Sequence, residues 1–316
     1  MFQAGAYLKR LSCAEEGGKA VFISKRTENN TIGKRAALGS NSLPLVIRRL
    51  KRDKPAQIAL GVFLIICFAC IFAPFVTRWS YSEINISRIL EYPSSDHILG
   101  TDSLGRDMFA RLLYGGRVTL RISSLSTLLA AAAGCFLGLM AGYAGSRLDL
   151  LITSVLDILS AIPSILLAVV IDIVFGWGRG YFLYAIAIAA VPQFAHLVRA
   201  CVMNMIKSEY IEAARALGVG KLRIMFRHVL RNIISPLAIR FASCFAEAIL
   251  SCTIMGYLSI DIKPPAPEWG VIVHSGRTYI WKQPLLIVFP CAVIAITIIS
   301  VNIFSDGLRD ALDPRE

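Results

Sequence analysis

Four long stretches of this sequence contain no aspartate, glutamate, lysine or arginine, and this feature limits the possible folds more than any other. The stretches are 56–77, 122–146, 180–198 and 283–305. Each reaches the ~20 residues that a helix needs to cross about 30 Å of hydrocarbon. Two further segments, near 150–177 and 235–258, are as apolar but contain isolated charges. The short alternating segments of a membrane β-barrel are absent, so we predict an all-α membrane protein with about six transmembrane helices.

Composition and charge distribution agree with a membrane location and argue against nucleic-acid binding. Apolar residues make up 56% of the chain and charged residues 17%, whereas soluble domains contain about 45–50% and about 25%. The net charge of +12 is concentrated: twelve of the 33 basic residues precede Ala56, and eight lie within 199–240. Basic clusters beside apolar spans are typical of cytoplasmic loops. We therefore place both clusters on the cytoplasmic side.

These patterns divide the chain into three parts. Residues 1–56 form a basic, flexible cytoplasmic extension, 57–305 a six-span domain, and 306–316 a cytoplasmic tail. The predicted spans are 57–76, 122–143, 150–175, 181–199, 235–258 and 284–304. Between them lie an outer segment (77–121), an inner coupling segment (205–234) and an outer loop (259–283). Arg117 and Arg121 in the outer segment oppose this orientation, but the two basic clusters decide it.

The sequence offers no catalytic or metal site. The glycine–lysine pairs that begin at Gly18, Gly33 and Gly220 lack the spacing of a phosphate-binding loop, so nucleotide chemistry is expected on another chain. The four histidines, at 97, 196, 228 and 274, show no metal-ligand spacing and are predicted to make ordinary polar contacts. The cysteines lie mostly in apolar spans, where they behave as small hydrophobic residues.

The inner coupling segment has the pattern of a short amphipathic helix pair. Residues 209–217 are good helix formers followed by Gly218 and Gly220. In the second half, an apolar stripe recurs at helical spacing: Leu222, Met225, Phe226 and Val229. A helix pair outside the membrane buries such a stripe either on the lipid surface or in a groove of a cytoplasmic partner.

The same segment carries a family resemblance. Glu212-Ala213-Ala214 with Gly218 is similar to the EAA motif of ABC importer permeases. An ordered series of further motifs resembles the dipeptide/oligopeptide/nickel branch of binding-protein-dependent importers: 97–107, 111–120, 141–145, 157–163, 264–270 and 306–314. The resemblance covers roughly residues 58–315. A lone EAA motif would be a weak signal, but the ordered series is specific.

The resemblance implies a permease subunit in a bacterial inner or plasma membrane, with both termini cytoplasmic. It implies three kinds of partner besides lipid: a second homologous permease, two cytoplasmic ABC ATPases that bind ATP and magnesium, and an extracytoplasmic solute-binding protein. This chain would bind no cofactor and catalyse no reaction. The solute would be a short peptide, or alternatively nickel or a nickel chelate. The residues expected to couple to the ATPases are Glu212, Ala213, Ala214, Gly218, Leu222, Met225 and Phe226.

Glu247 is the charge deepest in a predicted span. A carboxylate facing lipid costs about 2.5–3.5 kcal/mol, so we expect Glu247 to line the translocation path or a subunit interface, or to pair with another helix. An ion-coupled secondary transporter would instead use Glu247 and Asp172 as ion sites. That alternative leaves the amphipathic segment 209–231 unexplained, and no inverted repeat is visible.

Overall fold

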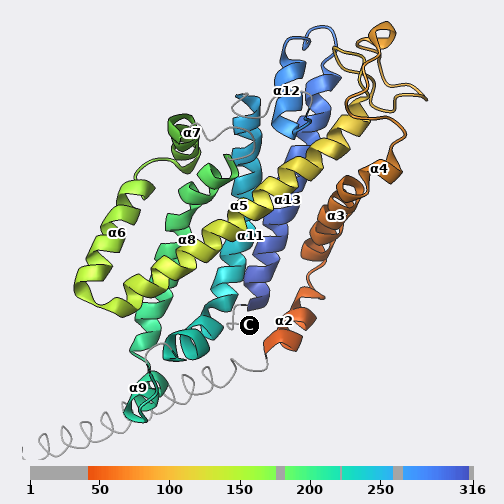
Figure 1. Ribbon diagram of the computed structural model, residues 1–316. Helices are drawn as coiled ribbons and strands as arrows, with labels where there is room; N and C mark the ends of the chain where they lie inside the picture. Colours follow the sequence, from red (N-terminus) through yellow and green to blue (C-terminus); the bar gives the residue numbers. More distant parts are fainter. Residues whose placement is uncertain (1–41, 176–181, 221–222, 259–265, 313–316) are drawn as a thin grey trace, which may run out of the picture. The chain divides into compact units, whose positions relative to one another are not determined.

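The computed structural model describes residues 42–175, 182–220, 223–258 and 266–312 (Figure 1). The chain divides into two units, 1–49 and 50–316. The described part of the first unit belongs to helix α2 (Ser42–Leu50), which ends at the first residue of the second unit.

The regular secondary structure of the described part of the second unit is helical, apart from an isolated bridge between Thr101 and Asp107 in the largely irregular segment 77–107. Its elements are α3 (Lys54–Ile71), α4 (Ala73–Val76), η2 (Ile86–Arg88), α5 (Met108–Ala144), α6 (Ser146–Ser160), α7 (Ser164–Phe175), α8 (Phe182–Ile206), α9 (Glu209–Ala216), η3 (Ile224–Val229), α11 (Leu230–Tyr257), α12 (Trp269–Arg277) and α13 (Leu285–Leu312). Among the described residues, 5 helices are long and apolar enough to cross a membrane, or 6 if α6 and α7 form one broken span. The predicted all-α membrane fold is confirmed.

Helix α5 begins well before the predicted start of its span. It starts at Met108 rather than at 122, and the Asp107 carboxylate caps it by accepting a hydrogen bond from the Ala110 N–H at 2.7 Å. The charge-free stretch marks only the part of a helix that can lie in hydrocarbon, so it underestimates a helix that extends beyond the membrane. For the same reason α8 continues to Ile206, and α13 continues to Leu312 through most of the predicted tail.

The third predicted span, 150–175, is not one straight helix. Helices α6 and α7 meet at an angle of 95°. Pro163 lies at the bend, directly before the first residue of α7. Proline has no N–H to donate and disfavours helical backbone at the residue before it, which accounts for a break at this position.

Helix α5 packs along α8 through a row of glycines. Gly134, Gly138 and Gly142 are spaced by four residues, so they share one face of α5. A Cβ atom on Gly138 would lie 2.5 Å from the Ala195 carbonyl oxygen, and one on Gly142 would lie 2.7 Å from Val202 Cγ1. Small residues at this spacing let two membrane helices approach closely. This packing fixes the central pair of the fold.

The long helix α5 connects two ends of the unit. At 37 residues it is about 55 Å long. Near its start, the buried indole of Trp269 in α12 donates a hydrogen bond to the Leu112 carbonyl at 2.9 Å; we call this region the α12 end. Near its other end, Arg215 of α9 lies over the Tyr143 ring at 5.7 Å; we call this region the α9 end.

Candidate functional site

Helix α9 contains the predicted EAA segment, and its sequence determines both of its ends. Ser208 occupies the N-cap position with extended backbone, and Glu209 and Glu212 lie in the first turn, where the helix dipole favours negative charge. At the other end Gly218 has a φ of +77°. The Val219 N–H donates to the Ala214 carbonyl at 3.1 Å, and the Gly218 N–H donates to the Arg215 carbonyl at 2.9 Å. This is a Schellman cap, and it requires the left-handed conformation that glycine adopts most easily.

The side chains of Ile211 and Tyr210 connect α9 to the rest of the unit. Ile211 is fully buried in a core with Leu139 of α5 and with Val198 and Val202 of α8. Asn232 of α11 also donates a hydrogen bond to the Tyr210 hydroxyl at 3.1 Å. Helix α9 is therefore in contact with three of the long helices, α5, α8 and α11.

The opposite face of α9 is free. Glu212 and Ala213 are exposed, and Ala214 is half-buried. Leu217, directly before Gly218, is 84% exposed. Leu217 therefore places an exposed apolar side chain at the C-terminal end of α9, on a helix that is anchored through Ile211. Leu217 was not among the predicted coupling residues, although the sequence shows that it lies between helix-forming residues and the capping Gly218.

The second half of the coupling segment differs from the expected helix pair. The π-helical turn η3 runs directly into α11 at Leu230 rather than forming a separate helix. Ile224 and Val229 are fully buried, and the half-buried Met225 packs against the same core as Ile211. Leu222 and the side chain of Phe226 lie outside the described part of the structure. The described members of the stripe thus pack against the chain's own helices.

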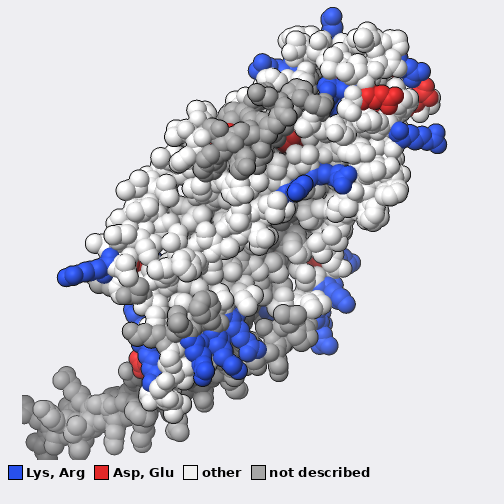
Figure 2. Space-filling model, in the orientation of Figure 1, with Lys and Arg blue, Asp and Glu red and all other residues white. Residues whose placement is uncertain are grey.

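Basic side chains surround α9. Figure 2 shows blue side chains gathered at the end of the unit where α9 and η3 lie. The exposed basic residues of these segments are Lys207, Arg215, Arg223, Arg227 and Arg231. They belong to the cluster that sequence analysis placed in the cytoplasm.

Glu247 lies exposed on α11, where its side chain is 49% accessible. Its carboxylate lies 3.5 Å from Arg240 Nη2 on the same helix. Arg240 in turn donates a hydrogen bond to the Gln193 side chain of α8. Among the described residues, the ion-pair partner of Glu247 is therefore on its own helix. The expected pairing of Glu247 with another helix is not found among these residues.

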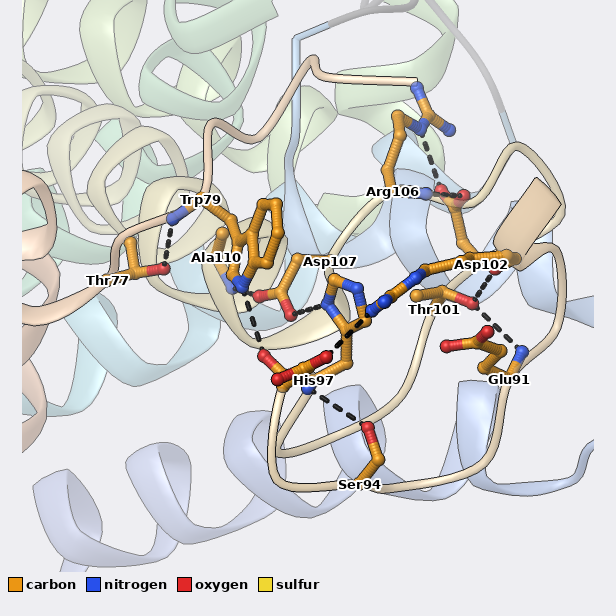
Figure 3. A network of polar contacts seen from close by, with 12 residues as sticks. Thr77, Trp79, Glu91, Ser94, His97, Thr101, Asp102, Arg106, Asp107 and Ala110 are labelled. Atoms are coloured by element: carbon orange, nitrogen blue, oxygen red, sulfur yellow. Dashed lines mark hydrogen bonds and ion pairs between the residues drawn. The ribbon is translucent and has the colours of Figure 1, made fainter. Parts of the chain in front are cut away.

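At the α12 end, the segment before α5 is ordered by buried charges (Figure 3). The Asp102 carboxylate accepts from Arg106 Nε at 2.8 Å and lies 2.9 Å from Arg111 Nη1. Its other oxygen accepts from the backbone N–H groups of Leu104 and Arg106. A carboxylate paired this fully is stable despite its burial. These residues lie in the motifs 97–107 and 111–120 that carry the family resemblance, but their charge pairing was not predicted from the sequence.

A second pair in the same segment joins His97 to the cap of α5. His97 Nδ1 lies 2.9 Å from Asp107 Oδ1, and both side chains are almost completely buried. The Trp79 ring packs on the imidazole, with ring centroids 4.7 Å apart, as Figure 3 shows. The predicted role of His97 as an ordinary polar contact agrees with this geometry.

Glu268 is a buried acid that sequence analysis did not identify. Its carboxylate accepts from Thr119 Oγ1 of α5 at 2.9 Å and from the Val271 N–H at 3.1 Å, which makes it the N-cap of α12. Burial raises the pKa of Glu268 from 4.5 to about 7, and these hydrogen bonds limit the rise. No local sequence signal shows that a capping acid is buried, because burial depends on how α5, α11 and α12 meet.

Two family models match the sequence. A model described as binding-protein-dependent transport system inner membrane component matches residues 134–316. A model described as the N-terminal TM domain of oligopeptide transport permease C matches residues 44–93.

Relatives of known function match along most of the chain. The dipeptide transport system permease protein of Alkalihalophilus pseudofirmus is 40% identical over 268 residues, covering 85% of this chain and 88% of the relative. The di/tripeptide transport system permease protein of Pseudomonas aeruginosa is 38% identical and covers 83% and 89%. The glutathione transport system permease protein of Pectobacterium atrosepticum is 36% identical and covers 85% and 89%.

A solved structure shares the fold. The MetNI methionine ABC transporter in an inward-facing conformation superposes with a TM-score of 0.53 at 19% identity, covering 65% of this chain and 98% of that chain. At this identity the similarity concerns the fold alone.

Proposed function

The chain belongs to the family of binding-protein-dependent transport system inner membrane components, and from this membership we propose that it forms, with a second homologous permease, the path for short peptides in an ATP-driven importer. It is a membrane-spanning permease of an ABC transporter. In the proposal, ATP and magnesium bind to two separate ATPase chains, and an extracytoplasmic binding protein delivers the solute.

The observation that carries the coupling part of this proposal is the geometry of α9. Ile211 fixes the helix to the cores of α5 and α8, while Leu217 and Ala213 remain exposed on the other side. A rigid helix with an exposed apolar tip fits a groove on a partner protein. When the ATPases close around ATP, α9 moves with them, and α5 and α8 follow because they share its core.

Peptides are favoured over nickel as the solute. The relatives that match along more than four fifths of this chain are named for dipeptide, di/tripeptide and glutathione transport. Among the described residues, no group of three or more histidine, cysteine, aspartate or glutamate side chains is placed to hold a metal ion. The observation that favours peptides is the naming of the relatives, and nickel uptake remains the alternative to be assayed beside peptide uptake.

The proposed orientation places the α9 end in the cytoplasm and the α12 end outside, in a bacterial cell membrane. It rests on the exposed basic residues around α9, because basic loops are retained on the cytoplasmic side. The ordered segment before α5 would then face the solute-binding protein.

Substitution of Leu217 tests the docking surface. Leu217→Asp places a charge where the partner's apolar groove is expected, and we predict that the chain no longer co-purifies with its ATPase. The matched control is Ile86→Asp, because Ile86 is 77% exposed but lies in η2, before α5. Both variants should reach the membrane in normal amounts. Undiminished co-purification of Leu217→Asp would remove the docking role and favour an α9 that lies on the lipid surface.

A further inference from the structure

A large pocket opens between α3 and α5 toward the α12 end. Its volume is about 940 Å³, and its walls are mostly apolar. Phe63 and Ile71 of α3 and Phe245 of α11 contribute to these walls, and Pro267 contributes from the segment before α12. Pockets for small ligands have volumes of about 300–1,000 Å³, with apolar walls and a few polar groups that orient the ligand. This pocket has both properties.

The polar groups of the pocket are concentrated on one face of α5. Arg117 and Arg121 are spaced by four residues, both line the pocket, and both are exposed. The Arg117 guanidinium lies 5.9 Å from the centre of the Tyr114 ring, and the Tyr81 ring lies 5.0 Å from that of Tyr114. Figure 2 shows blue basic side chain atoms over the upper half of α5, on a face that is mostly white.

Among the described residues, neither guanidinium has an acidic partner. Within the described part of the chain, no aspartate or glutamate oxygen lies within ion-pairing distance of Arg117 or Arg121. Arg121 directly precedes the charge-free stretch that begins at 122, and Arg117 lies four residues before Arg121. Near a helix end, arginine side chains extend to the membrane–water interface, where both exposed guanidinium groups are accessible to an anionic ligand.

We propose that Arg117 and Arg121 form a subsite for the terminal carboxylate of a peptide, with the peptide's apolar side chains in the adjoining pocket. A guanidinium binds a carboxylate through two parallel N–H···O bonds, a geometry that a lysine does not offer. Tyr81 and Tyr114 also line the pocket, and their hydroxyl groups are further potential hydrogen-bond donors. This inference rests on the proposed peptide transport, because a peptide combines a free carboxylate with apolar side chains.

A lipid headgroup is a second source of an anion attached to an apolar body. The pocket's lining favours the peptide, because Tyr81 and Pro267 from two segments outside the spans border it as well as the helices. The experiment therefore includes a measurement that distinguishes peptide from lipid.

The first measurement is uptake by the complete transporter in proteoliposomes, with alanyl-phenylalanine and its carboxy-terminal amide as substrates. The double variant Arg117→Gln, Arg121→Gln should raise KM for the free acid about tenfold or more, as loss of a charge-assisted pair requires. KM for the amide should stay within about twofold of the wild type. The matched control is Arg277→Gln, because Arg277 lies over Tyr257 at the same 5.9 Å but outside the pocket.

The second measurement uses the full chain alone in lipid nanodiscs. Ser124→Cys places a thiol at the pocket lining, three residues after Arg121. A negatively charged methanethiosulfonate should label position 124 several times faster than a positively charged one, and the double variant should abolish this preference. Alanyl-phenylalanine should slow the labelling in discs of neutral lipid.

The outcomes separate the subsite from the proposed function. Wild-type uptake of peptide with an equal KM change for acid and amide would overturn the subsite alone. Protection of position 124 by phosphatidylglycerol but not by the peptide would assign the arginines to lipid and likewise overturn it. A wild-type transporter that takes up neither peptide would overturn the proposed function, and the subsite with it.

Discussion

Glu268 is held in a place that disfavours its charge. The side chain is fully buried and caps α12, and burial raises its pKa to about 7. The folded chain therefore holds a proton that the unfolded chain releases above about pH 4.5. By linkage, the free energy of unfolding falls as the pH rises from about 4.5 to about 7 and is level above that range.

Glu268→Gln should reduce this pH dependence. In the wild type, ionisation of Glu268 lowers the free energy of unfolding by an amount on the order of 3 kcal/mol by about pH 7. The amide cannot ionise, so the variant should not show this decrease. Thermal unfolding in detergent should show a smaller difference in Tm between pH 5 and pH 8 than the wild type. Glu83→Gln, a change at an exposed acid in the segment before α5, should leave that difference unchanged. A variant that loses as much stability as the wild type between these pH values would refute the assignment.

Gly218 illustrates what could be read from the sequence at this scale. A glycine after a helix former suggested a turn, and the φ of +77° agrees. A Cβ there would meet no atom within 4 Å, so a substitution is opposed by the backbone alone. The burial of Glu268 could not be read in the same way, because it arises from contacts between helices far apart in the sequence.

Gly218→Val should uncouple the chain from its ATPase. A β-branched residue at positive φ costs about 1–3 kcal/mol, which would unwind the last turn of α9 and displace Leu217. We expect normal membrane levels, loss of co-purification with the ATPase, and loss of uptake. Gly220→Val is the matched control, because Gly220 also has open space around it but no positive φ. Intact coupling in Gly218→Val would show that the cap does not position the docking tip.

At the scale of elements, the close contact between α5 and α8 depends on glycines in α5, which have no side chain at the contact. Gly138→Ala would place a Cβ 2.5 Å from the Ala195 carbonyl oxygen and 2.8 Å from Val198 Cβ. The helices would have to separate, so the free energy of unfolding should fall by about 1–3 kcal/mol. Gly61→Ala in α3 has open space and should be neutral or stabilising by up to about 1 kcal/mol. Denaturation of both variants in the same detergent checks the difference, and equal stability would contradict this packing.

The break between α6 and α7 shows why the sequence predicts spans better than their shapes. Pro163 lies at a 95° bend, whereas Pro192, Pro236 and Pro290 lie inside continuous helices. The local effect of proline is the same at all four positions. Whether the helix breaks depends on which neighbours satisfy the freed carbonyl groups, and that is a property of the packed protein. The existence and order of the spans could be predicted, because they depend only on apolar runs long enough to cross the membrane.

At the scale of the whole molecule, α5 connects the two regions to which we assign functions. Arg117 and Arg121 lie near its start, beside the pocket, and Tyr143 near its end lies against Arg215 of α9. The helix is continuous over 37 residues, so a movement imposed at the α9 end reaches the pocket without passing through a loop. Helix α9 and its capping glycine could be predicted from the sequence pattern. The pocket could not, because α3, α5 and α11 each contribute only part of its wall.

Uptake of radiolabelled alanyl-phenylalanine into proteoliposomes distinguishes the importer from a transporter that works alone. The chain is reconstituted either by itself or with its second permease, its ATPases and its binding protein, and uptake is recorded with ATP or with an imposed proton or sodium gradient. We expect accumulation only in the complete assembly, only with ATP, and unchanged when ion gradients are collapsed. Accumulation by the chain alone under an ion gradient would contradict the importer and favour a secondary transporter.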